Sequence, residues 1–353
     1  MATLAMAQPQ ATWLERQHDF GVILEEDGKA KCAMRVVNTG DQPLLIVKAQ
    51  AGCGCTGITF PETPVPPGDT ALVSISYNPS GRPGEFSKDV IIHTNTVPKR
   101  TTLEITGNVI PSAATLDKQY PLRAGALRIS QSMLPFGELA RGAGKVLYLS
   151  AYNGSTDTLI VQVSGNKPHL HPAMVPDTVP PARVTALTVH YLSANAPLWG
   201  LNTDTLTLSC RSLNSDHGDL SGMATVQVMA QVTENFDRLT DRQRHDAPVA
   251  RVDCGDRIDF GTVKRGDIVS RTFTITNKGR EKLHLRRLWA PEGEGITTTT
   301  DKQEAKRGKS ITATVTVDTS RHEGELINVP LTLMCNDPET PQQIIRLVGI
   351  IDN

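Results

Sequence analysis

The sequence has 353 residues, which corresponds to two or three domains at roughly 100–200 residues per domain. Hydrophobic residues make up 39% of the chain, and 28 Gly and 23 Pro are spread along it, so the composition is that of a globular protein with frequent turns and excludes a collagen-like or disordered chain. The 36 basic and 37 acidic residues give a net charge of -1, and no apolar run approaches about 18 residues, so we expect neither nucleic-acid binding through a basic surface nor a transmembrane segment.

The N-terminus has features of an export signal. Ala5-Met6-Ala7 forms the A-x-A pattern that signal peptidase leaves, although the apolar stretch before it is shorter than a whole signal peptide and has no basic residue. We interpret residues 1–14 as a residual signal and N-terminal segment; the alternative is an alanine-rich N-terminus without that meaning. The first interpretation predicts export through a signal peptide to the periplasm or cell envelope.

The chain contains one ordered set of motifs three times. A Phe-Gly pair comes first, an Asn-containing turn follows 17 or 18 residues later, and a second turn then precedes an alternating run. The Phe-Gly pairs are Phe20-Gly21, Phe136-Gly137 and Phe260-Gly261. The Asn turns are Asn38-Thr39-Gly40, Asn153-Gly154-Ser155 and Asn277-Lys278-Gly279. A repeat of about 120 residues is too long for a solenoid unit, so we predict that each copy is a domain with its Phe in an equivalent position.

The local pattern within each copy is that of β-strands. Val269, Phe273 and Ile275 alternate with Ser and Thr, and alternation with a period of two buries one face of a strand and exposes the other. Short β-branched runs bounded by Gly, Pro, Asn and Asp recur along the chain. We therefore predict an all-β protein of three tandem immunoglobulin-like antiparallel β-sandwich domains. Their expected boundaries are 15–111, 112–236 and 252–353, with a polar linker at 237–251.

The turns and junctions give further expectations. The Asn-x-Gly turns are interpreted as tight connections in which Asn and Gly adopt positive φ. Glu25 and Glu26 are expected in a solvated turn, and Trp289 is expected to cap the third core. The polar segment 234–256 is predicted to form a short helix or an exposed linker, with hinging there.

The first copy carries motifs that resemble a known family. It contains Asp19-Phe20-Gly21, Val37-Asn38-Thr39-Gly40, Ala51-Gly52-Cys53-Gly54-Cys55-Thr56 and Pro67-Gly68. This set resembles the bacterial DUF1573 family of unknown function, which is abundant in Bacteroidetes and related to the ASH and Hydin immunoglobulin-like domains. The third copy keeps the Phe-Gly and Asn motifs without the paired cysteines, and the middle copy diverges most. The resemblance implies the immunoglobulin-like fold and export. It does not point to any activity, because the family has none assigned.

Cys53-Gly54-Cys55 is the sharpest chemical feature of the sequence. In extended backbone both thiols would point the same way, and such a pair could bind a soft metal ion such as Cu(I) or exchange a disulfide. The alternative, which we favour, is a purely structural role as a loop or as a simple local disulfide. No further ligand is fixed by the sequence, although His18 and Met34 are the nearest candidates.

The other cysteines are predicted to be structural. Cys210 and Cys335 each follow leucines of the same strand parity, so we expect them at equivalent buried positions, where Thr94 stands in the first copy. Cys32 shares a face with Met34. The pairing of Cys254 stays open.

His169-Leu170-His171 places two imidazoles on one strand face, an arrangement that could bind Zn or Cu. No third ligand is evident, and the flanking prolines favour a surface loop instead. Neither a catalytic Gly-x-Ser-x-Gly elbow nor a phosphate loop nor a His-Glu-x-x-His motif is present in the sequence.

These observations favour a non-enzymatic exported structural or protein–protein interaction protein of the cell envelope, with envelope proteins as partners and no cofactor. The alternative is a periplasmic metal-binding or thiol-redox protein that uses Cys53 and Cys55. Fold alone does not choose between the two.

Overall fold

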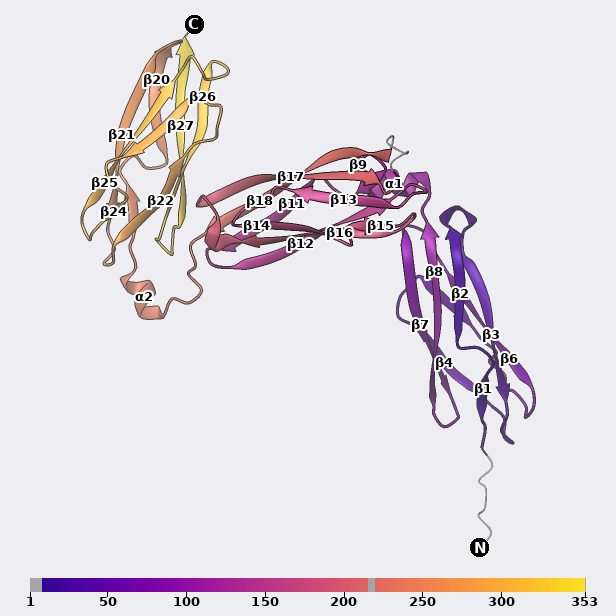
Figure 1. Ribbon diagram of the computed structural model, residues 1–353. Helices are drawn as coiled ribbons and strands as arrows, with labels where there is room; N and C mark the ends of the chain where they lie inside the picture. The colour runs from indigo at the N-terminus through magenta and orange to yellow at the C-terminus, as the bar shows by residue number, and fades with distance from the viewer. Residues whose placement is uncertain (1–7, 215–219, 353) are drawn as a thin grey trace.

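The computed structural model describes residues 8–214 and 220–352. Figure 1 shows three elongated sandwiches in sequence order along a bent string. Each sandwich encloses its own hydrophobic cluster, so the chain has three separate cores. The Ala5-Met6-Ala7 pattern lies outside the described residues. Within them, no helix has the length and apolar character that a membrane span requires.

The first sandwich consists of two four-stranded sheets. One sheet has the order β1-β3-β6-β5 and the other β2-β8-β7-β4. The strands are β1 (Ala11–Trp13), β2 (Gln17–Leu24), β3 (Ala30–Asn38), β4 (Ile46–Ala51), β5 (Thr56–Thr59), β6 (Thr70–Tyr77), β7 (Gly84–Thr94) and β8 (Arg100–Ile110), with a 3-10 turn at Glu25–Asp27.

The middle sandwich consists of two five-stranded sheets. Their orders are β14-β16-β12-β10-β9 and β11-β18-β17-β13-β15. It is preceded by α1 (Ala113–Gln119) and has a 3-10 turn at Ser193–Asn195. The strands are β9 (Leu122–Ala124), β10 (Leu127–Ile129), β11 (Met133–Ala140), β12 (Gly144–Asn153), β13 (Leu159–Ser164), β14 (Leu170–Val175), β15 (Thr178–Val179), β16 (Val184–Leu192), β17 (Gly200–Ser212) and β18 (Gly222–Thr233).

The third sandwich follows α2 (Asp241–Asp246) and has sheets of order β19-β21-β25-β23 and β20-β27-β26-β22-β24. The strands are β19 (Ala250–Val252), β20 (Arg257–Lys264), β21 (Ile268–Asn277), β22 (Leu283–Trp289), β23 (Ile296–Thr300), β24 (Glu304–Ala305), β25 (Ser310–Asp318), β26 (Leu326–Cys335) and β27 (Gln342–Asp352). The predicted all-β fold of three immunoglobulin-like sandwiches is therefore confirmed.

One strand pair in each sandwich departs from the predicted antiparallel pattern. β2 runs parallel to β8, β11 to β18 and β20 to β27. Alternation of polar and apolar residues is the same in parallel and antiparallel strands, so it could not reveal these pairs. They pair a strand near the start of each domain with its last strand, which lies far away in sequence.

The Phe-Gly pairs occupy equivalent places in these strands. Each parallel pair shifts its register at the Phe-Gly motif, and the glycine adopts a positive φ of 65°, 71° or 70° at Gly21, Gly137 and Gly261. Positive φ costs other residues steric strain, which explains the glycine. The predicted equivalence of the three Phe residues is confirmed, although a short strand precedes the Phe strand in every domain.

Two expected boundaries need correction. Ala11–Trp13, assigned above to the N-terminal segment, pairs with β3, and Trp13 is buried in the first core. Ala250 and Arg251, assigned above to the linker, pair with β21. Both segments are only three residues long, and so short an edge strand has too little alternation to be recognised in sequence.

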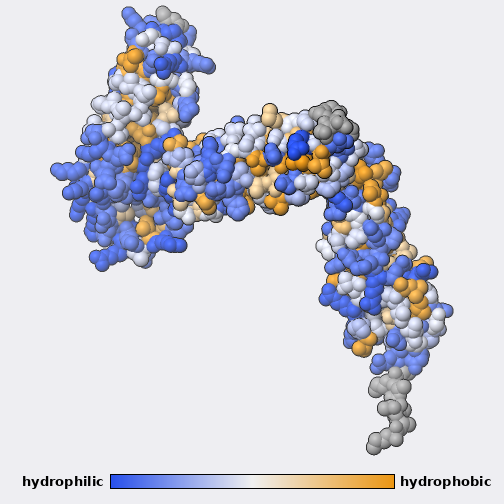
Figure 2. All heavy atoms as spheres, viewed as in Figure 1, coloured by the Kyte–Doolittle hydropathy of each residue, from blue (hydrophilic) through white to orange (hydrophobic). Residues whose placement is uncertain are grey.

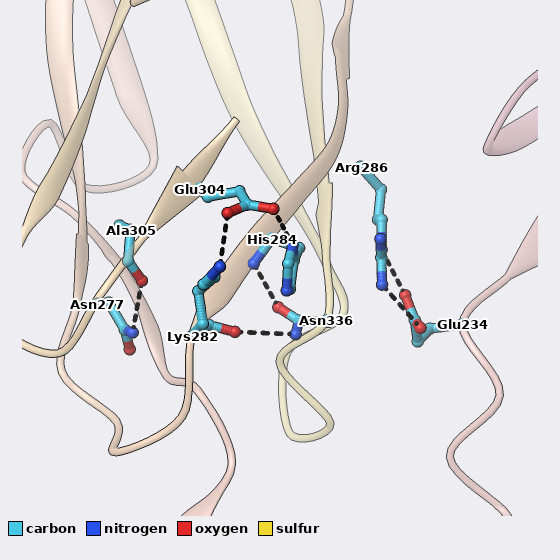
Figure 3. Close-up of polar contacts among 8 residues, drawn as sticks. All are labelled: Glu234, Asn277, Lys282, His284, Arg286, Glu304, Ala305 and Asn336. Carbon is cyan, nitrogen blue, oxygen red and sulfur yellow. Dashed lines mark hydrogen bonds and ion pairs between the residues drawn. The ribbon is translucent and has the colours of Figure 1, made fainter. Parts of the chain in front are cut away.

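The geometry that the three Asn turns share differs from the expected positive-φ turn. Asn38, Asn153 and Asn277 have no exposed surface, and none has a positive φ. The Asn277 side-chain amide donates to the carbonyl oxygens of Glu281 at 2.7 Å and Ala305 at 3.0 Å, and its oxygen accepts from the Gly279 N–H at 3.0 Å. Figure 3 shows the contact with Ala305. The Asn is therefore a buried link between two loops.

The same pattern holds in the other two domains, and it also explains the glycine. Asn38 donates to the carbonyls of Gln42 and Val65, as Asn153 does to those of Asp157 and Val179. A Cβ on Gly40 would collide with the backbone at Gln8 and Gln10. Close approach of the entering chain, and not φ, therefore requires the glycine here.

Replacing Asn277 by Ala should lower the free energy of unfolding of the third domain by about 2–4 kcal/mol, because one buried and one part-buried carbonyl and one buried N–H lose their partner. Hydrogen exchange of β22 in the full chain measures this loss. Asn328→Ala, at an exposed position of the same domain, is the matched control and should change exchange by less than about 0.5 kcal/mol. Equal effects of the two substitutions would contradict the assigned role.

Candidate functional site

Cys53 and Cys55 lie in the connection between β4 and β5, at one end of the first sandwich. In the structure they are joined to each other by a disulfide. The Thr56 hydroxyl lies 3.7 Å from each sulfur, Cys55 is buried in the first core and Cys53 is half-buried. The bond closes a loop that contains one residue, so it constrains only this connection.

A bonded pair has no thiolate to offer a metal ion, so metal binding at this loop would first require reduction. The suggested extra ligands lie elsewhere in the packing. Met34 is fully buried in β3, and His18 packs edge-on against Phe20 with ring centroids 4.6 Å apart. Over residues 8–214 and 220–352, no group of three or more His, Cys, Asp or Glu residues is arranged to hold a metal ion.

The remaining four cysteines are free thiols. Cys210 and Cys335 are buried and occupy equivalent register positions, opposite Val161 and Leu285 respectively, while Thr94 takes this place opposite Ile46. Burial raises the pKa of Cys335 to about 12, which keeps it an unreactive thiol near neutral pH. Their predicted structural role is therefore supported by the packing.

The two histidines of the His-Leu-His segment do not share a site, and His169 is not on a surface loop. Its ring is buried, and Nε2 lies 2.8 Å from an Asp204 carboxylate oxygen. Lys167 Nζ lies 2.6 Å from the other oxygen of that carboxylate. His171 points outward from β14. A buried carboxylate needs partners, and it recruits His169 from the segment just before the strand.

Asp204 is ionised at neutral pH. Burial opposes its charge, but the hydrogen bonds from Lys167 and His169 and their charges outweigh this effect and lower its pKa. The cluster therefore serves as an anchor at one end of the middle domain. His169 has a partner that no sequence spacing indicates, because Asp204 lies 35 residues further along the chain, in β17.

Glu25 links the first domain to the segment that leads into the second, in contrast to the expected solvated turn. One carboxylate oxygen accepts from the Gly81 N–H at 2.8 Å and from the Thr115 hydroxyl at 2.7 Å, and the other accepts from the Ser112 N–H at 2.8 Å. Ser112 in turn caps the N-terminus of α1. The carboxylate thus holds α1 against the first domain.

Further contacts complete this first joint. The Gln119 side chain at the end of α1 donates to the Gly81 carbonyl at 3.0 Å. Arg183 of the middle domain pairs with Glu85 of the first domain. The joint therefore connects the first two domains both through α1 and by the direct ion pair of Arg183 with Glu85.

The second joint centres on Trp199. The guanidinium groups of Arg141 and Arg286 lie 4.6 Å and 4.9 Å from the centre of its ring, a distance typical of cation–π contacts. Arg286 belongs to the third domain and also makes two hydrogen bonds to the Glu234 carboxylate, at 2.7 Å and 3.1 Å. Figure 3 shows this pairing across the joint.

Backbone groups reinforce the same joint. Arg287 donates to the Trp199 carbonyl at 3.0 Å, and its guanidinium lies 4.5 Å from the centre of the Trp289 ring. The Trp289 ring lies against Gly200, where a Cβ would be 2.8 Å from it. Trp289 therefore packs on the middle domain and does not cap the third core. Of the two forms expected for segment 234–256, the structure has the short helix, α2, and these specific contacts lie beside it.

A hollow of about 440 Å³ lies beside this joint, between the linker and the third domain. It is lined by residues 234–236, the α2 region from Leu239 to Pro248, Glu281 and Asn336. Figure 3 shows that Asn336 and Glu304 are already engaged by Lys282 and His284. The Thr240 hydroxyl and the Gln243 side chain form a capping box that fixes α2 at its rim.

Sequence reasoning missed the joint residues because their partners are distant. One run of residues could have indicated the second joint, namely Arg286-Arg287-Leu288-Trp289. It combines basic and aromatic residues, the two types that form cation–π contacts. Glu25 had no comparable signal, because acidic residues in turns are usually solvated.

Comparison with known proteins identifies relatives of the domains. The sequence model of the family "Protein of unknown function (DUF1573)" matches residues 11–109 and 254–351, which is more than half of the chain. No curated protein matches the sequence.

Similar solved structures show low sequence identity. A protein of unknown function from Porphyromonas gingivalis W83 is 20% identical, with a TM-score of 0.47, covering 64% of this chain and 100% of its own. The seventh PapD-like (ASH) domain of human CEP192 is 12% identical, with a TM-score of 0.28, covering 33% of this chain and 92% of its own. The I-band fragment I67–I69 of titin is 12% identical, with a TM-score of 0.21, covering 99% of this chain and 100% of its own.

The disulfide predicts a defined alkylation pattern. In the unfolded chain without reductant, four cysteines should be alkylated, and with reductant all six should be. Intact-mass spectrometry of protein purified from an oxidising compartment separates the two cases. The double substitution Cys53→Ser and Cys55→Ser should give four alkylations under both conditions, and six in the wild type without reductant would contradict the disulfide.

Glu25→Gln should loosen the first joint, because an amide NH₂ then faces groups that donate to the carboxylate. We expect a loss of about 1–2 kcal/mol in the free energy of unfolding of the first domain, allowing for solvent screening of a half-buried group. Thermal unfolding of the full chain measures it, and Glu26→Gln, at an exposed neighbour, is the control.

The same carboxylate gives a pH dependence. Burial raises its pKa, but the hydrogen bonds from Gly81, Ser112 and Thr115 outweigh this and hold the pKa below its ordinary value of 4.5. Its contribution to stability should therefore be complete above pH 4.5 and be lost as the pH falls through the lowered pKa. The difference between wild type and Glu25→Gln should shrink in this acid range, and a difference that does not change with pH would contradict the ionic role.

Proposed function

The chain belongs to the DUF1573 family of proteins of unknown function, and we propose that it is a non-enzymatic protein–protein interaction protein of the cell envelope. In this role it presents the surfaces of three immunoglobulin-like domains at set positions along a string. The observation that carries the proposal is the construction of the two joints, which hold successive domains by specific side-chain contacts.

The joints account for charged residues that would otherwise suggest chemistry. Hydrogen bonds that hold one part of the chain to another engage the side chains of Glu25, Glu234 and Arg286. Asp204 is used in the same way within the middle domain. Fixed joints matter for a protein whose partners contact more than one domain, because less conformational entropy is lost on binding when the domains are already positioned.

Export is supported by two features. The Ala5-Met6-Ala7 pattern is one, and the Cys53–Cys55 disulfide is the other, since disulfides form and persist in oxidising compartments such as the periplasm. We propose the periplasm or cell envelope as the location, with envelope proteins as the partners.

A thiol-redox role of the Cys53–Cys55 loop is the second candidate function. The half-buried Cys53 sulfur in a bond at the surface of the first domain favours thiol exchange over metal binding, because the bonded sulfurs are poor metal ligands. The double substitution Cys53→Ser and Cys55→Ser distinguishes the candidates, since an interaction protein should keep its partners without the pair.

Trp199→Ala should release the second joint, because it removes the ring on which Arg141 and Arg286 lie. Small-angle X-ray scattering of the full chain should show a broader range of overall dimensions, while circular dichroism should stay that of the wild type. Leu198→Ala, at the exposed adjacent residue, is the matched control and should leave the scattering unchanged.

The same two variants test the function in cells. The full-length protein should be recovered from the envelope fraction in discrete crosslinked adducts with envelope proteins, and Trp199→Ala should reduce adducts that involve both the middle and third domains. A chain that stays in the cytoplasmic fraction without adducts would contradict the proposal. Adducts that Trp199→Ala leaves unchanged would show that fixed positioning of the domains is not what the partners need.

A further inference from the structure

The partner of His171 on the sheet surface is His190, and not His169. β14 and β16 are antiparallel, and His171 lies directly opposite His190 in their register. Both side chains are exposed, while the flanking pair Leu170 and Tyr191 points into the core. Directly opposed residues have Cβ atoms roughly 4.5–5.5 Å apart, close enough for two imidazoles to bind one metal ion.

One of the two rings is already oriented for this role. His171 Nδ1 lies 3.0 Å from the side-chain oxygen of Asn166. An amide oxygen can only accept, so Nδ1 carries the hydrogen, and in the neutral ring Nε2 keeps its lone pair for a metal ion. A hydrogen bond from the non-coordinating ring nitrogen is the usual support of a metal-binding histidine.

The part of the sheet face that β12, β14 and β16 form around the pair has no charged residue at its outward positions. Every second residue of 144–150, 171–175 and 184–192 points outward from β12, β14 and β16, and none of them is Asp, Glu, Lys or Arg. Tyr148 is 73% exposed and Val175 is 57% exposed on this face. Figure 2 shows hydrophobic residues at the surface of the middle domain, whereas the region near α2 is mostly hydrophilic.

We propose that His171 and His190 form half of a tetrahedral site for a transition-metal ion such as Zn²⁺, and that a second copy of the chain completes the site with its own two histidines. Two ligands from one chain are half of the four that Zn²⁺ takes in a closed site. Over the residues that the structure describes, no third His, Cys, Asp or Glu joins the pair.

A second copy fits the observations because it supplies the missing ligands and matches the face. In a twofold dimer the same patch meets itself, so each chain contributes an identical pair of imidazoles. A self-meeting patch with charges of one sign would repel its copy, and the outward positions of β12, β14 and β16 have no charged residue. Exposed apolar side chains such as Tyr148 and Val175 become buried in the contact.

Sedimentation velocity of the full chain with and without Zn²⁺ tests the proposal. We expect a monomer in the presence of chelator and a dimer with Zn²⁺, with about one metal ion bound for every two chains. Co²⁺ as a substitute should give the visible absorption of tetrahedral coordination. His190→Ala and His171→Ala should each abolish the metal-dependent dimer, and His245→Ala, at an exposed histidine of α2, should not.

Tyr148→Asp provides a second, independent variant. It leaves both imidazoles in place but brings two like charges into the contact, so the dimer should require at least about tenfold more protein. Absence of bound Zn²⁺, one ion per chain on a persistent monomer, or a dimer that survives His190→Ala would each overturn the proposal. None of these outcomes depends on an envelope partner, so the test is separate from that of the proposed function.

Discussion

The buried asparagine of each domain is the contact on which the rest of the sandwich depends. Its amide holds the loop that follows one strand against the loop that leads into another, and its oxygen fixes the turn itself. With this link satisfied, the glycine two residues later can lie against the entering chain in the first and third domains. The entering strand, the turn and the start of β6 or β25 are thereby positioned together.

The joints extend this order from one domain to the next. Each uses few residues, but they are aromatic or carry charges that are fully engaged, as Trp199, Arg286 and Glu25 show. Contacts of this kind depend on geometry as well as on burial, so they fix an orientation more than a large apolar contact would. A small number of side chains therefore fixes the orientation of each domain relative to the next.

The sequence was sufficient to predict the features that follow from repeated motifs and from the alternation of polar and apolar residues. Three ordered motifs revealed three domains, and strand parity placed Cys210 and Cys335 correctly. It could not predict the parallel pairs, the short strand at Ala11–Trp13 or the partners of Glu25 and His169, because these depend on contacts between distant segments. For Cys53 and Cys55 the sequence left a disulfide and a metal site open, since proximity in sequence fits both.

The parallel pairing of a domain's early strand with its last strand has a mechanical consequence. In β2 and β8 the chain enters at one end of the sandwich and leaves at the other, so tandem domains extend the string. Tension applied along the chain pulls these two strands past each other and loads their backbone hydrogen bonds together. An antiparallel terminal pair would open one bond at a time from its end. The three domains thus resist extension in shear.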